Sequence, residues 1–228
     1  MDVGNQMIKV LYEDNHLLVV EKPINIPVQA DESKDLDLLT MLKQYIKDKY
    51  QKPGNVYLGL VHRLDRPVGG VMVFAKTSKC ASRLSEQVRT HQIEKEYHAV
   101  VMNKTPSEGK FYDKLLKNRK TNIVTVDERG KEAILNYKLI EYKENMSLVK
   151  IDLITGRSHQ IRVQFASRNY PLYGDQKYNM NSKVKEQIAL YATSLTILHP
   201  TTKEVMTFKT ELPNSYPWKL FNNKDLKK

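Results

Sequence analysis

The chain has 228 residues, of which 40% are hydrophobic and 28% are charged. This composition excludes a disordered chain and is typical of a folded protein with its own core. The formal net charge of +11 favours a polyanionic partner, either a nucleic acid or an anionic membrane surface; a lysine-rich surface that only maintains solubility is the alternative. The single cysteine, Cys80, excludes an internal disulfide and any zinc site built from several cysteines.

Runs of aliphatic and β-branched residues predict strands, and several of them alternate apolar with polar residues as half-buried antiparallel strands do. In chain order the predicted strands are 8–13, 16–22, 55–61, 71–76, 96–102, 133–142, 147–153 and 204–210.

Apolar residues at helical spacing predict helices over 35–50, 77–91 and 157–169. The second helix follows a serine N-cap and contains Cys80, which we expect to be a small buried apolar residue; Ser158 is a plausible cap of the third. Many strands with few helices predict a single α+β domain around a largely antiparallel mixed sheet.

The N-terminal stretch MDVGNQMIKV has neither a basic flank nor a long apolar core, and no run approaches the ~18 apolar residues of a membrane span. We therefore expect a reducing, cytoplasmic location and no membrane association.

Asp65 lies on the predicted connection between two apolar strands, in the stretch VHRLDRPVGGVMVFA. Pro67, Gly69 and Gly70 favour a tight turn there. A carboxylate on such a turn is accessible and rigidly positioned, as catalytic groups are. The alternative is a turn-forming aspartate that binds its own backbone.

In the stretch DLITGRSHQIRVQFA, Gly156 breaks the preceding strand, and Arg157, His159 and Arg162 follow at the predicted start of a helix. This set suits a phosphate or a carboxylate, and Arg162 could pair bidentately with a carboxylate. An exposed helix with ordinary basic residues is the alternative.

The stretch KLLKNRKTN contains no acid and is predicted to be a loop or ribbon between strands. Either it contacts phosphates or it is an ordinary solvated surface. Its basic residues are Lys114, Lys117, Arg119 and Lys120.

Motifs for other chemistry are missing from the sequence. His62, Asp65 and His159 do not have metal-ligand spacing, since no HxxxH or HxH occurs. There is no GxSxG elbow, and neither GxGxxG nor GxxxxGK[ST] occurs. We therefore expect neither a metal nor a cofactor.

Taken together, the motifs resemble those of the RluA family of pseudouridine synthases, in order and over nearly the whole chain. The two most specific are HRLD at 62–65 and TGRSHQIRVQFA at 155–166. The others are YEDNHLLVVEKP (12–23), VFAKT (73–77), IEKEYHAVV (93–101), GDQKY (174–178), LHP (198–200) and LP (212–213).

The resemblance implies the pseudouridine synthase catalytic fold over 8–218, with short extensions at 1–7 and 219–228 and no accessory RNA-binding domain ahead of it. It implies that Asp65 attacks the target uridine, that Tyr97 stacks on the uracil and assists removal of the carbon-5 proton, and that Arg162 pairs with the catalytic carboxylate. An arginine partner favours the ionised form of a buried carboxylate. Whether Asp65 attacks the base or the sugar carbon, or abstracts a sugar proton, stays open.

The family reaction acts on an extruded base, so an arginine and an aromatic ring must replace the lost stacking. The resemblance gives Arg63 the first of these roles. We expect RNA contacts from the residues His62, Arg63, Lys114, Lys117, Arg119, Lys120, Arg157 and His159.

The sequence departs from the family pattern after the catalytic aspartate, where Val68 and Gly69 replace the usual Thr-Ser. Asn25 and Asn179 each replace a usual glycine, and we expect both to tolerate a left-handed backbone. The turn at Asp65 is expected to survive, since Gly70 remains.

We expect an enzyme, an isomerase acting on a specific uridine of structured ribosomal or transfer RNA, and a monomer. A catalytically silent RNA-binding protein on the same fold is the second hypothesis, motivated by Val68 and Gly69. A metal-dependent nuclease using His62, Asp65 and His159 is the third.

Overall fold

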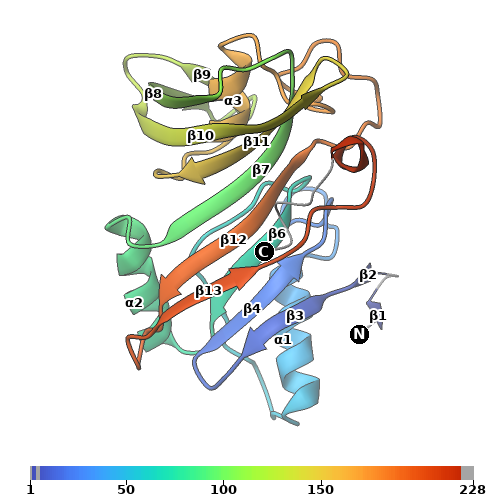
Figure 1. Cartoon of the computed structure of the whole chain (residues 1–228). Helices are drawn as coiled ribbons and strands as arrows, with labels where there is room; N and C mark the ends of the chain where they lie inside the picture. Colours follow the sequence, from blue (N-terminus) through green and yellow to red (C-terminus); the bar gives the residue numbers. More distant parts are fainter. Residues whose placement is uncertain (1, 4–5, 222–228) are drawn as a thin grey trace. The chain divides into compact units, whose positions relative to one another are not determined.

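A computed structural model describes residues 2–3 and 6–221. Backbone contacts divide the chain into two compact units (Figure 1). Unit 1 contains the residues up to Ile93 together with Ser194–Thr210, and unit 2 contains Glu94–Thr193 together with the residues from Glu211 onward. A single catalytic domain over 8–218 remains a prediction.

The sheet of unit 1 is built from long-range strand pairs. Strand β4 (Leu17–Lys22) pairs antiparallel with β3 (Lys9–Glu13) on one side and with β6 (Gly69–Ala75) on the other. The order continues from β6 to β12 (Leu190–Leu198), whose last five residues belong to this unit. The remaining strands are β5 (Gly59–Leu60) beside β6, β13 (Val205–Lys209) beside β12, and the short pair β1 (Asp2–Val3) and β2 (Gln6–Met7).

Two helices belong to unit 1, and each begins at a side-chain cap. Asp37 accepts a hydrogen bond from the backbone of Thr40 at the start of α1 (Leu38–Lys49), and Thr77 accepts one from the backbone of Cys80 at the start of α2 (Ser78–Arg89). These bonds satisfy amide groups that the first turn of a helix leaves unpaired.

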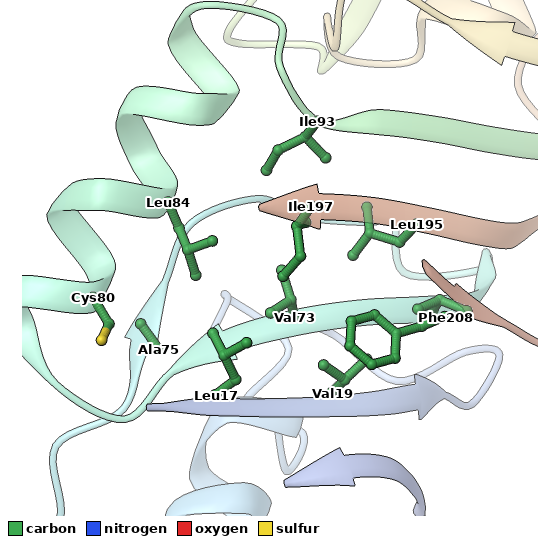
Figure 2. Close-up of a cluster of buried hydrophobic side chains, with 11 residues drawn as sticks. Leu17, Val19, Val73, Ala75, Cys80, Leu84, Ile93, Leu195, Ile197 and Phe208 are labelled. Carbon is green, nitrogen blue, oxygen red and sulfur yellow. The ribbon is translucent and has the colours of Figure 1, made fainter. Parts of the chain in front are cut away.

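The core of unit 1 forms where α2 covers the sheet. Figure 2 shows side chains from α2, β4, β6, β12 and β13 converging there. Strand β6 is buried at every position, because the residues on its other face are also covered. The labelled cluster contains Leu17, Val19, Val73, Ala75, Cys80, Leu84, Ile93, Leu195, Ile197 and Phe208.

Unit 2 is an antiparallel sheet with one short helix. Its strand order is β12, β7 (Glu94–Met102), β11 (Met146–Leu153), β10 (Lys131–Lys143), β8 (Glu108–Asn118) and β9 (Ile123–Val126). Phe165 of α3 (Gln160–Ala166) packs edge-on against Phe111 and Tyr137, with ring centroids 4.9 and 5.3 Å away. A 3₁₀ turn, η1 (Trp218–Leu220), follows later in the chain.

The predicted α+β class with a largely antiparallel sheet is confirmed, and Cys80 is buried as expected. The prediction that Ser158 caps the third helix is wrong: α3 begins after His159, which has a left-handed backbone (φ 51°) and makes no side-chain cap. Thr77, not the following serine, caps α2. Of the predicted strand 55–61 only Gly59–Leu60 forms a strand. Strands β8, β9 and β12 were not predicted.

Candidate active site

Asp65 lies in unit 1, in the connection between β5 and β6. The amide of Val68 donates to the carbonyl oxygen of Asp65 over 2.9 Å and closes a tight turn over Arg66 and Pro67. The predicted turn is therefore confirmed despite the replaced Thr-Ser pair. Gly69 and Gly70, however, belong to β6, where Gly70 has a φ of 122° that side chains rarely adopt.

The ammonium of Lys22 donates hydrogen bonds to the backbone of this turn. Lys22 is fully buried at the end of β4, and its Nζ donates to the carbonyl oxygens of Pro23, Arg66 and Val68 at 2.9, 3.0 and 2.8 Å. Two of these acceptors, the carbonyls of Arg66 and Val68, follow Asp65 in the turn. One buried side chain thus connects the Lys-Pro dipeptide to the backbone that positions the carboxylate.

This buried environment changes the pKa of Lys22. Burial lowers its pKa to about 7, although the nearby charge of Asp65 raises it and that of Arg66 lowers it. Sequence reasoning used Lys22 only as part of the Lys-Pro motif. The signal that could have identified it is a lysine two residues after the apolar run LLVV, at the end of a predicted strand.

The other polar residues of this loop have separate roles. His62 accepts a hydrogen bond at Nε2 from the amide of Val73 over 3.1 Å, which fixes the ring against β6. Arg66 is held by Asp35 and by Ser33. Arg63 and Arg66 are both exposed, but Arg63 makes no hydrogen bond or ion pair within residues 2–3 and 6–221, so it is the arginine of this loop that no other side chain holds.

In unit 2, Arg162 and Asp175 form a buried bidentate pair. The Nε and one terminal nitrogen of Arg162 donate to the two carboxylate oxygens of Asp175 at 2.9 and 2.6 Å. The guanidinium also lies over the ring of Tyr178, 5.2 Å from its centroid. Sequence reasoning missed Asp175, although it lies in the quoted motif GDQKY. The expected pairing of Arg162 with Asp65, which lies in the other unit, remains a prediction.

The TGRSHQIR segment folds around its own side chains. Gln160 accepts from the hydroxyl of Thr155 and the amide of Arg157 at 2.8 and 2.9 Å. The Nδ1 of His159 lies 2.7 Å from the hydroxyl of Tyr178, and that hydroxyl accepts from the amide of Val124. His159 is therefore tied to the GDQKY motif and to β9. Arg157 is exposed, and its Nε donates to the carbonyl of Glu132 over 2.8 Å.

Tyr97 is a buried residue of β7, opposite Ile151 of β11. The predicted basic ribbon is confirmed as the β8–β9 hairpin. Lys114 lies on β8 and pairs with Glu128 over 3.0 Å. The other three members, which are exposed, are Lys117, Arg119 and Lys120.

Asn25 has the left-handed backbone expected of it, with a φ of 64°. Asn179 does not, and the expectation for it is wrong. Its side chain is buried and donates to the carbonyl of Leu172 over 3.0 Å, so a hydrogen bond explains this asparagine better than backbone conformation.

Within the described residues, no group of three or more His, Cys, Asp or Glu side chains has an arrangement that could hold a metal ion. No helix in the same part of the chain is long and apolar enough to cross a membrane.

Replacing Asp175 by alanine should lower the free energy of unfolding by about 3–5 kcal/mol, because Arg162 would keep its buried charge without its partner. Glu128→Ala removes the carboxylate of the exposed pair with Lys114 and should change the free energy by less than about 1 kcal/mol. Urea denaturation of both variants measures this, and equal effects would contradict the assignment.

Lys22→Met should make stability respond differently to pH. Between pH 7 and 10.5 unfolded wild-type protein binds a proton on Lys22 that the folded protein does not, so this group adds stability as pH rises, by up to about 1.4 kcal/mol per pH unit. The variant lacks this gain. The difference in free energy of unfolding between wild type and variant should therefore grow in favour of wild type from pH 7 to 10; a constant difference would contradict the assigned pKa.

Comparison with known proteins identifies the family. The family model described as RNA pseudouridylate synthase matches residues 16–167. The ribosomal large subunit pseudouridine synthase C of Buchnera aphidicola is 34% identical, with 90% of this chain and 70% of the relative covered. The ribosomal large subunit pseudouridine synthase D of Zymomonas mobilis is 32% identical, with 90% and 69% covered.

Among solved structures, human RNA pseudouridylate synthase domain containing 4 has a similar fold, with a TM-score of 0.76, 23% identity, and 90% of this chain and 88% of that chain covered. The chain therefore belongs to the RNA pseudouridylate synthase family and is an RNA pseudouridine synthase, an isomerase, as its resemblance to the RluA family predicts.

Proposed function

We propose that this enzyme converts a specific uridine of large-subunit ribosomal RNA to pseudouridine, with Asp65 as the catalytic carboxylate. The observation that carries the proposal is the turn at Asp65, in which the carbonyls of Arg66 and Val68 accept hydrogen bonds from the buried ammonium of Lys22. The choice of RNA is supported by relatives named for the ribosomal large subunit. Transfer RNA is the alternative substrate.

The reaction conserves every atom of the nucleotide. The bond between N1 of uracil and C1′ of ribose breaks, the base rotates, and a bond forms between C5 and C1′. The proton on C5 leaves and N1 gains one. No electrons are gained or lost, so the proposal requires no redox cofactor. Asp65 acts at the base, at the sugar carbon, or on a sugar proton, and each route requires its carboxylate.

The target uridine must leave the RNA stack to reach a carboxylate in a half-buried turn. We assign the replacement of its stacking to Arg63, because this arginine is exposed while Arg66 is held by Asp35 and Ser33. Tyr97 is assigned to stack on the extruded uracil and to assist removal of the C5 proton.

Arg162 is assigned to pair with Asp65 when RNA is bound. Its bidentate contact with Asp175 fixes the plane of the guanidinium before any substrate arrives, which reduces the reorganisation that pairing requires. We assign phosphate contacts to the β8–β9 hairpin, where three basic side chains are exposed without an acidic partner within the described residues.

We further propose that the enzyme acts as a monomer in the cytoplasm without a cofactor. A catalytically silent RNA-binding protein remains the second candidate, since Val68 and Gly69 replace two hydroxyl residues of the family pattern. Retention of Asp65, Tyr97 and Arg162 together favours the enzyme.

Asp65→Asn should lower the rate of pseudouridine formation by at least about 10³-fold, because it removes the reacting charge, while RNA binding persists. The assay is release of tritium from RNA labelled at C5 of uridine. The matched control is Asp152→Asn, which neutralises an exposed carboxylate of β11 and should retain wild-type activity.

Wild-type activity should also survive a chelator. Normal activity of the Asp65→Asn enzyme would overturn the assignment. A wild-type enzyme that binds RNA but forms no pseudouridine in any ribosomal or transfer RNA would favour the silent RNA-binding protein.

A further inference from the structure

Lys95 is a half-buried lysine of β7 that the proposed chemistry does not use. It makes no hydrogen bond and no ion pair with any residue in the described part of the chain. Two other lysines of unit 2 are paired with carboxylates: Lys150 contacts Glu96 at 2.6 Å, and Lys114 contacts Glu128 at 3.0 Å. The desolvation of the Lys95 ammonium is therefore unfavourable, and no acid of the described residues compensates it.

The ammonium of Lys95 lies against the turn that follows β11. A Cβ built on Gly156 would lie 3.2 Å from its Nζ, so the absence of a side chain at Gly156 leaves room for the ammonium. The next residue, Arg157, is anchored through Nε to the carbonyl of Glu132, and its two terminal nitrogens make no hydrogen bond with the described residues. The ammonium of Lys95 thus lies at Gly156, the residue before Arg157, and neither cation contacts an acid within the described residues.

The electrostatics agree with this geometry. Burial lowers the pKa of Lys95 below its ordinary value, and the positive charge of Arg157 lowers it further. Each positive charge destabilises the charged form of the other group, and an anion placed between them would stabilise both charged forms.

The position of Lys95 on β7 indicates which anion would bind there. Residues i and i+2 of a strand lie on the same face, so Lys95 and Tyr97 share one face of β7. The neighbouring acids, Glu94 and Glu96, belong to the opposite face, and Glu96 is paired with Lys150. An RNA strand whose base stacks on Tyr97 would bring a backbone phosphate close to this end of the strand.

We propose that Lys95 and Arg157 together bind an RNA backbone phosphate beside the extruded uridine, which makes Lys95 a substrate-positioning residue. The proposal rests on the proposed function, since it uses the assignment of Tyr97 to the uracil. It goes further by naming the group that fixes the register of the nucleotide, a role that requires no base contact.

The test compares Lys95→Met with Lys138→Met. Lys138 is an exposed lysine of β10 that lies opposite Lys150, so it is on the other face of the sheet from Tyr97. Both substitutions remove one positive charge and keep a long side chain. Binding to unmodified large-subunit ribosomal RNA, transcribed in vitro, is measured over a range of salt concentrations in the Asp65→Asn background, where the RNA is not converted.

Lys95→Met should weaken binding about three- to tenfold and reduce the slope of log K against log salt by about 0.7–0.9, the loss of one phosphate contact. Lys138→Met should change neither. With Asp65 restored, Lys95→Met should raise KM and leave kcat within about twofold. Its thermal midpoint should equal or exceed that of wild type, because an uncompensated buried charge is removed.

An unchanged affinity and salt slope for Lys95→Met, or an equal loss in Lys138→Met, would overturn the phosphate site. A large loss of thermal stability in Lys95→Met would also overturn it, because the lysine would then be structural. These outcomes are independent of the proposed function, whose failure is the absence of pseudouridine in RNA treated with wild-type enzyme.

Discussion

The ammonium of Lys22 is enclosed by three backbone carbonyls at the end of β4. A fully buried lysine without a carboxylate in contact is costly, and its pKa of about 7 reflects that cost. The carbonyls that compensate it belong to Pro23 and to the turn at Asp65, so the lysine and the turn require each other. In unit 1 this interaction connects the sheet directly to the turn that contains Asp65.

In unit 2 the buried cation Arg162 is stabilised by a carboxylate instead of by backbone carbonyls. Arg162 is paired with its own carboxylate, Asp175, whose oxygens also accept amide hydrogen bonds from Lys177 and Tyr178. The guanidinium is thus oriented without RNA. Lys95 and Arg157 are the contrasting case, since no acid of the described residues contacts them. Paired cations have a structural partner, whereas the unpaired ones are suited to an anionic ligand.

Much of the fold followed from hydrophobic pattern. The apolar run in 16–22 and the alternation in 147–153 predicted β4 and β11 closely, and the stripe of leucines in 35–50 predicted α1. Strand β8 was not assigned because charged residues interrupt it, and it is stabilised by its partner β10 more than by its own propensity. Helix α3 is shorter than predicted because Gln160 binds the preceding loop, a contact that periodicity does not reveal.

The turn of the candidate site was predictable because its residues are close in the sequence, as Asp65, Pro67 and Gly70 are. The site was not predictable where a side chain acts through a distant backbone, as Lys22 does over 44 and 46 residues. Asp175 was missed because its partner Arg162 is a side chain 13 residues away in a different motif.

The central claim is that Asp65 of this chain isomerises a uridine of large-subunit ribosomal RNA. The most direct measurement maps pseudouridines in the RNA of cells that carry the gene, lack it, or carry it with Asp65→Asn. We expect one or more large-subunit sites that disappear without the gene, return with wild type and stay absent with Asp65→Asn. A site restored by Asp65→Asn, or an unchanged map in cells that lack the gene, would contradict it.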